Sequence, residues 1–163
     1  MSDLEKLAER LGHLLLERGE WLAAAESCTG GWLAQSVTAI AGSSAWFDRG
    51  FVTYSNAAKM DMLGVPESTL DRHGAVSEAV ARAMAQGALA HSRADWTVAI
   101  TGIAGPGGGS PEKPIGTVCF AWASKNGGCE ATLSLFSGDR ATIREQAVRF
   151  ALNGLIDRLG SVS

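Results

Sequence analysis

Three short runs of small, hydroxyl-bearing and glycine residues stand out in this sequence, because each follows an apolar or β-branched run typical of a buried strand. The runs are Glu26-Ser27-Cys28-Thr29-Gly30-Gly31, Tyr54-Ser55-Asn56-Ala57-Ala58-Lys59 and Thr101-Gly102-Ile103-Ala104-Gly105-Pro106. Open parallel sheets bind ligands beyond the carboxyl ends of their strands. We therefore expect the three runs to converge on one crevice and to form an active site there.

The first two runs contain a candidate nucleophile and a candidate base. Ser27 lies where a predicted strand turns into a helix, and the amides of residues 28–31 precede the helical hydrogen bonds, so they could hold an oxyanion or a phosphate. A serine hydroxyl needs a base within hydrogen-bond reach. Lys59 is the best candidate, since a lysine desolvated in a crevice can lose its proton near neutral pH. Tyr54 could relay or stabilise that proton.

Other nucleophiles compete with Ser27. Ser44 lies in the break Gly42-Ser43-Ser44, just before the strand that leads to Tyr54, and the residues alone leave the choice between the two serines open. Cys28 competes as a thiolate, because a helix N-terminus lowers a cysteine pKa. We rank it below serine, since no histidine partner is visible. A Ser-His-Asp triad is disfavoured, because none of the histidines follows a strand beside the glycine runs: His13, His73 and His91.

Each of these residues also has a purely structural interpretation. Ser27 could cap a helix, and Lys59 could be a solvated charge. Tyr54 could be a half-buried strand residue with its hydroxyl in water, and Thr101-Gly102 could simply end a strand. Their shared placement at successive strand ends, beside a glycine-rich loop, favours a functional site over these interpretations.

Helices and strands alternate in the predicted fold. The expected strands span residues 21–25, 47–54, 96–100, 115–123 and 131–136, and a loop runs from Thr101 to Pro114. The expected helices are one capped by Asp3 and ending near Gly19, one from Gly30 to Ala41, a short one after Lys59 that runs to Leu63, one after Pro66, one from Ser77 to His91 and one that Asp139 caps. The last two strands form a hairpin through Asn126-Gly127-Gly128. We predict one three-layer α/β/α domain over residues 1–163, with a mixed, mostly parallel sheet.

Composition excludes several functional classes. The net charge is -3 with no basic stripe, which argues against nucleic-acid binding. The three cysteines have neither CxxC spacing nor nearby histidines, so we expect no metal site, no disulfide framework and a reducing cytoplasm. No signal peptide or membrane-spanning run is visible. The sequence GPGGGS after Ala104 lacks the Lys-Ser/Thr ending of a nucleotide-binding P-loop, and we expect no cofactor.

The order of the longer motifs resembles the CinA C-terminal domain family. The motifs are AESCTGG, GSSAWFDRGFVTYSNAAK, GAVSE, TGIAGPGGGSPEKPIGTV and FSGDR, and together they cover nearly the whole chain. Stand-alone members of this family look like nicotinamide-nucleotide amidases, which hydrolyse the carboxamide of nicotinamide mononucleotide to nicotinate mononucleotide and ammonia in pyridine nucleotide recycling. The larger competence/damage-inducible proteins carry a further N-terminal domain, which we do not expect in this chain.

The resemblance implies roles for particular residues. Ser27 becomes the leading nucleophile, with Lys59 and Tyr54 as the base system and Ser44 as either a second hydroxyl in the relay or the nucleophile itself. Arg140 could pair with the substrate phosphate, or could equally be a solvated residue in the first turn of a helix. The remaining substrate-binding candidates are backbone or side-chain groups of Glu26, Thr29, Gly30, Gly31, Thr101, Gly102, Ala104 and Gly105.

Two alternatives to this enzyme stay open. One is a non-catalytic nucleotide-sensing or interaction domain, and the other is an amidase that acts on another small nucleotide or amide. The presence of a nucleophile and a base together favours an enzyme, because binding alone needs neither. A homodimer is also possible, through an exposed apolar helix face or through the hairpin.

Overall fold

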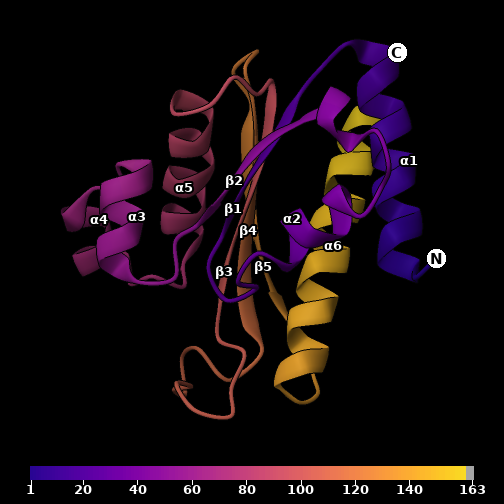
Figure 1. Cartoon of the computed structure of the whole chain (residues 1–163). Helices are drawn as coiled ribbons and strands as arrows, with labels where there is room; N and C mark the ends of the chain where they lie inside the picture. The colour runs from indigo at the N-terminus through magenta and orange to yellow at the C-terminus, as the bar shows by residue number, and fades with distance from the viewer. Residues whose placement is uncertain (161–163) are drawn as a thin grey trace.

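The computed structural model describes residues 1–160, which form a five-stranded sheet with helices on both faces (Figure 1). The strands lie in the order β2-β1-β3-β4-β5. They are β1 (Leu22–Glu26), β2 (Phe47–Val52), β3 (Trp96–Gly102), β4 (Thr117–Ser124) and β5 (Cys129–Leu135). The helices are α1 (Asp3–Arg18), α2 (Trp32–Thr38), α3 (Asn56–Leu63), α4 (Glu67–His73), α5 (Glu78–Ala90) and α6 (Arg140–Gly160), and a 3-10 turn, η1, spans Ser43–Ala45.

The sheet is mixed, as the sequence predicted. Strand β1 pairs in parallel with both β2 and β3, whereas β4 is antiparallel to β3 and to β5. Four strands therefore run in one direction, and β4 alone runs in the other. The carboxyl ends of β1, β2, β3 and β5 consequently share one edge of the sheet, and each of the loops that follow them begins at that edge.

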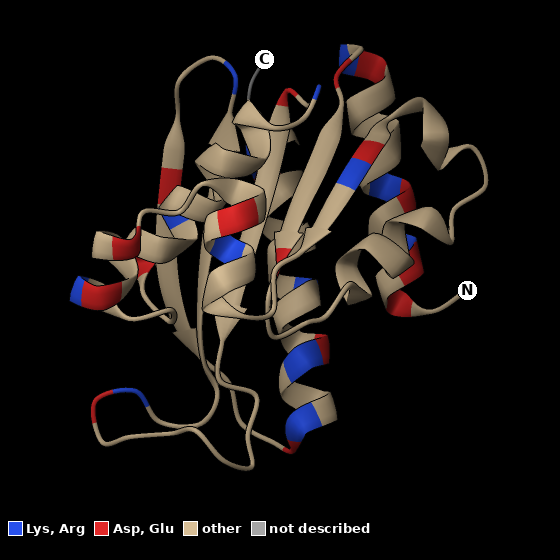
Figure 2. Cartoon of the chain, turned by 60° about the vertical axis from the view of Figure 1, so that its left-hand side comes forward, with Lys and Arg blue, Asp and Glu red and all other residues tan. Residues whose placement is uncertain are grey.

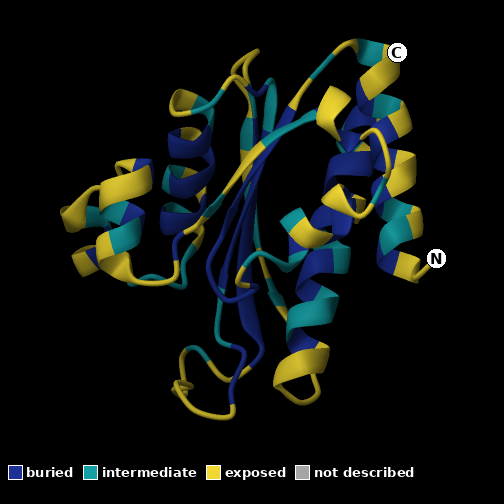
Figure 3. Cartoon of the chain, viewed as in Figure 1, coloured by how far each residue is buried: buried dark blue, intermediate teal, exposed yellow. Residues whose placement is uncertain are grey.

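Two apolar layers enclose the sheet. One layer packs α1, α2 and α6 against one face of the strands, around Leu11, Phe120 and Leu152. The other packs α3, α4 and α5 against the opposite face, around Met84. The three central strands β1, β3 and β4 are mostly buried, whereas the edge strands β2 and β5 are half-buried or exposed. The other exposed residues gather on outer helix faces and loops (Figure 3). Burial on both faces explains why β1 reads as a continuous apolar run.

Several predicted boundaries move by a few residues. Ser2, not Asp3, caps α1, because its hydroxyl accepts from the Glu5 amide at 3.1 Å and Asp3 is already helical. Helix α2 is shorter than predicted and ends at Thr38. Helix α3 begins before Lys59, which places that lysine inside the helix. Asp139 does cap α6, since its carboxylate accepts from the Thr142 amide at 2.9 Å.

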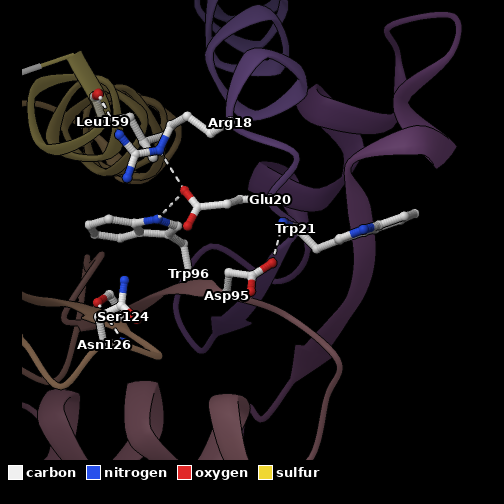
Figure 4. A network of polar contacts seen from close by, with 8 residues as sticks. All are labelled: Arg18, Glu20, Trp21, Asp95, Trp96, Ser124, Asn126 and Leu159. Atoms are coloured by element: carbon white, nitrogen blue, oxygen red, sulfur yellow. Dashed lines mark hydrogen bonds and ion pairs between the residues drawn. The ribbon is translucent and has the colours of Figure 1, made fainter. Parts of the chain in front are cut away.

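A polar network lies at the edge of the sheet opposite the carboxyl ends of β1, β2 and β3 (Figure 4). The carboxylate of Glu20 accepts from the Arg18 guanidinium and from the Trp96 indole, the latter at 3.1 Å. Arg18 also donates to the Leu159 carbonyl at 3.2 Å. These contacts tie the ends of α1 and α6 to the start of β3.

Within residues 1–160, no helix is both long and apolar enough to span a bilayer.

Candidate active site

A pocket of about 290 Å³ lies at the edge where β1, β2 and β3 end. All three predicted runs contribute to it, because the parallel strands deliver their following loops to the same edge. The residues that line it are Ser27, Cys28, Tyr54, Asn56, Lys59, Ala75, Val76, Thr101, Gly102, Ile103, Ala104, Gly105, Gly107, Gly108 and Arg140. The structure thus confirms the convergence that the strand order led us to expect.

Ser27 and Lys59 form a direct hydrogen-bonded pair in this pocket. The Nζ of Lys59 lies 2.9 Å from the Oγ of Ser27. Only 7% of Ser27 and 1% of Lys59 is exposed. A lysine so fully buried is unusual unless its amine has partners.

The remaining partners of the Lys59 amine are two main-chain carbonyls. Nζ lies 2.9 Å from the Thr53 oxygen and 3.4 Å from the Tyr54 oxygen. A carbonyl oxygen can only accept, and a neutral amine has two hydrogens and one lone pair. The two carbonyls can therefore take both hydrogens and leave the lone pair facing the Ser27 hydroxyl. Burial lowers the pKa of Lys59, which favours this neutral form.

Local structure explains how the two side chains meet. The Ser27 amide donates to the Ile100 carbonyl at 2.9 Å, so the strand pairing of β1 with β3 continues for one residue into the turn. Lys59 lies in the first turns of α3, which Ser55 caps by accepting from the Ala58 amide at 3.0 Å. The long lysine stem then reaches back beneath the segment that joins β2 to α3.

The turn after Ser27 is held by the side chain of Glu26. This buried carboxylate accepts from the Thr29 hydroxyl at 2.7 Å and from the amides of Leu33 and Ala34 at 2.9 and 3.1 Å. It therefore occupies the N-terminus of α2, where a substrate phosphate would meet like charge. None of the substrate-binding candidates from this turn lines the pocket: Glu26, Thr29, Gly30 and Gly31.

The mouth of the pocket carries an arginine bridge. Arg140 donates to the Gly105 carbonyl at 2.7 Å and to the Tyr54 phenol oxygen at 3.0 Å. Tyr54 is 61% exposed, and it is the main-chain carbonyl of this residue that contacts Lys59. The structure thus places the phenol at the rim of the pocket, beside the glycine-rich loop.

The two rival nucleophiles are poorly placed. Ser44 is exposed in η1, which precedes β2, and β2 begins beside the start of β1 at Leu22. It therefore lies at the opposite edge of the sheet from Ser27 and does not line the pocket. Cys28 does line it, but burial raises the pKa of its thiol to about 11, against the lowering expected at a helix N-terminus. None of the three histidines lines the pocket.

The fold also brings to the site several residues for which the sequence indicated no individual role. Asn56 lines the pocket one position into α3, and Ala75 and Val76 come from the loop before α5. Thr101 was predicted, and its hydroxyl donates to the Ala75 carbonyl at 2.9 Å. Arg144, which contacts the turn after Ser27 from outside the pocket, was not singled out. Its spacing of four residues from Arg140 on a predicted helix was the available signal.

The fold and the pocket together define a class: an α/β domain with a serine–lysine pair at the carboxyl edge of its sheet. In the described part of the chain, residues 1–160, no group of three or more His, Cys, Asp or Glu side chains is arranged to hold a metal ion. The chain belongs to the CinA family, because the model of the CinA C-terminal domain matches residues 4–159.

Relatives of known name span the same length. The chain is 57% identical to the nicotinamide-nucleotide amidohydrolase PncC of Escherichia coli K12 over 94% of this chain and 93% of that protein. It is 48% identical to the protein of the same name from Pseudomonas putida, over 96% and 97% of the two chains. The crystal structure of the competence/damage inducible protein CihA from Agrobacterium tumefaciens matches with a TM-score of 0.94 and 50% identity, over 99% and 98% of the chains.

Proposed function

We propose that this protein hydrolyses the carboxamide of nicotinamide mononucleotide to nicotinate mononucleotide and ammonia, with Ser27 as the nucleophile and Lys59 as its base. The observation that carries the proposal is the 2.9 Å contact between Lys59 Nζ and Ser27 Oγ in the pocket. The names of the similar amidohydrolases supply the substrate. Together they assign the chain to pyridine nucleotide recycling.

The proposed reaction has two halves. Lys59 takes the proton of Ser27, whose Oγ attacks the carboxamide carbon. The resulting Lys59 ammonium then gives a proton to the amide nitrogen, the C–N bond breaks, and the nitrogen leaves as ammonia. This leaves the nicotinate group as an ester on Ser27. Water then attacks the ester with Lys59 again as base, and the Ser27 oxygen leaves with the returned proton. The buried amine suits both halves, because it can start and end each half in the neutral form.

The negative oxygen of the tetrahedral intermediate requires a donor close to Ser27. The amide of Gly30 already donates to the Ser27 carbonyl at 3.0 Å, and two amides of α2 donate to Glu26. Cys28 directly follows the nucleophile and lines the pocket, and among the described residues its amide has no main-chain acceptor. We therefore propose Cys28 N–H as the main oxyanion donor of the turn that the sequence singled out.

The phosphate of the substrate belongs at the other side of the pocket in this proposal. The N-terminus of α2 is occupied by Glu26, whereas Arg140 lies at the rim with only neutral oxygens as partners. A phosphate would offer its guanidinium a stronger, charge-assisted contact. In this proposal the nucleotide lies along residues 101–108, between Ser27 and Arg140.

Two further expectations remain part of the proposal. We propose a cytoplasmic location, which suits the three cysteine side chains, since none of them is joined in a disulfide. We also propose a homodimer, because Leu133 and Leu135 on the edge strand β5 are exposed.

The test is ammonia release from nicotinamide mononucleotide by purified protein in the presence of a chelator, with the product identified by chromatography. We expect release by the wild type, loss of release in Ser27→Ala, and near-normal release in the matched control Ser44→Ala. Saturable nucleotide binding without product in the wild type would instead favour a sensing domain. Loss in Ser44→Ala alone would move the nucleophile to the other serine.

A further inference from the structure

The turn that carries Ser27 is held not only by Glu26 but also by the guanidinium of Arg144. Its Nε donates to the Cys28 carbonyl at 3.0 Å, and its Nη2 donates to the Thr29 carbonyl at 3.1 Å. The same guanidinium lies 5.5 Å from the centre of the Trp32 ring. Within residues 1–160 no carboxylate lies at ion-pair distance from Arg144, so its hydrogen bonds go to this turn.

This turn needs such support because of its glycines. Gly30 and Gly31 adopt φ values of 58° and 102°, in a region that glycine enters freely. A segment with this freedom has several accessible conformations unless its carbonyls and amides are fixed. Arg144 fixes two successive peptide units at once, which a planar guanidinium can do and a lysine ammonium cannot do with the same geometry.

The peptide units on both sides of Cys28 are thereby fixed. The unit that joins Ser27 to Cys28 is held by the Gly30 amide, which donates to the Ser27 carbonyl at 3.0 Å. The unit that joins Cys28 to Thr29 is held by Arg144. Both backbone torsions of Cys28 are therefore constrained, and with them the direction of its N–H group relative to Ser27 Oγ.

Helix α6 supplies this contact from its first turns. Arg140 and Arg144 are four residues apart and so lie on the same face of the helix. Figure 2 shows the basic residues at the beginning of α6, close to the loop at 103–116. Arg140 reaches the rim of the pocket, and Arg144 reaches the back of the nucleophile turn.

We propose that Arg144 is a positioning residue, which holds the Ser27 turn in the geometry that acyl transfer requires. The inference rests on the proposed function, because it takes Ser27 as the nucleophile and Cys28 N–H as the oxyanion donor. It adds a residue that does not touch the substrate and acts through the main chain of residues 28 and 29. A misplacement of about 1 Å at such a site costs up to about a hundredfold in rate.

The test compares Arg144→Lys and Arg144→Ala with the control Arg149→Ala. Arg149 lies on the same helix, and its ion pairs with Glu145 and Asp3 do not involve the turn. We expect kcat for nicotinamide mononucleotide to fall about tenfold to a hundredfold in both Arg144 variants, with KM changed less than about threefold. A cooperative thermal unfolding transition shows that each variant is folded. If Arg144→Ala does not fold, the comparison uses Arg144→Lys alone.

A second readout does not depend on the nucleotide. The rate at which a fluorophosphonate ester modifies Ser27, followed by mass spectrometry, should fall by a similar factor in the Arg144 variants and not in Arg149→Ala. If the wild type is modified but releases no ammonia, the proposed substrate is wrong. The modification rates of the Arg144 variants still test the positioning role in that case. Unchanged kcat and modification rate in folded Arg144 variants, or a change in KM alone, would overturn the positioning role.

Discussion

Ser27 and Lys59 should behave as one catalytic unit, which a double-mutant cycle can test. The perturbations are Ser27→Ala, Lys59→Met and the two together. A positioned general base contributes about 10² to 10⁴ in rate, or about 2.7 to 5.4 kcal/mol of activation free energy at 1.36 kcal/mol per tenfold. Lys59 Nζ contacts Ser27 Oγ directly at 2.9 Å, so the lysine has no proton to take once that oxygen is removed.

We therefore expect the double variant to be no slower than Ser27→Ala alone. Two independent contributions would instead multiply, and the double variant would then be slower than Ser27→Ala by the full factor of Lys59→Met. The assay measures the initial rates of ammonia and nicotinate mononucleotide formation by the wild type, the two single variants and the double variant. Lys113→Met is the matched control, because Lys113 Nζ contacts the His73 carbonyl on the exposed loop. Multiplying losses, or an active Lys59→Met protein, would refute the pairing.

Four further outcomes follow from the site. Burial lowers the pKa of Lys59, and the neutral amine is the base, so kcat/KM should rise with pH through a pKa below 10.5. A kcat/KM that falls over that range would argue against Lys59 as the base. Hydroxylamine should compete with water for the Ser27 ester and yield the hydroxamate, detectable by mass spectrometry, whereas a reaction without a covalent ester would yield none. Arg140→Met should raise KM about tenfold to a hundredfold with little change in kcat, and an unchanged KM would remove the phosphate from this position. Cys28→Ala should keep kcat within about threefold, since its raised thiol pKa leaves little thiolate, and a loss as large as that of Ser27→Ala would reopen the choice of nucleophile.

The sequence predicted the convergence of the three runs because strand direction alone decides it. A run that follows a parallel strand must emerge at the carboxyl edge, whatever the side chains around it. The same rule places Ser44 at the other edge, since it precedes β2 rather than follows it. Arg140 reaches the site by this rule too, because β5 ends at the same edge as β3.

Other features of the site depend on contacts that the order of residues does not specify. Glu26 ends a strand and could point to substrate or to protein, and only the packing of α2 shows that its carboxylate serves the helix amides. The Tyr54 phenol could likewise have faced the lysine, and the fold directs it to Arg140. Arg144 belongs to a segment more than a hundred residues from the turn that it holds. Its spacing from Arg140 indicates a shared helix face, but the sequence does not show that this face meets the Ser27 turn.

The buried environment of Lys59 explains how the fold tolerates this amine and why the amine is reactive. Strand β2 ends at Val52. Without the lysine amine, the Thr53 carbonyl would lack a donor among the described residues, and the Tyr54 carbonyl would keep only a 3.5 Å contact with the Ser27 hydroxyl. The lysine amine supplies those donors, which offsets part of the cost of enclosing it. Neutral carbonyls compensate a positive charge less well than a carboxylate would, so desolvation still lowers the pKa of the amine. The contacts that hold the lysine in place therefore also leave its lone pair available to Ser27. Lys113, whose Nζ makes an exposed contact with the His73 carbonyl, has no comparable environment.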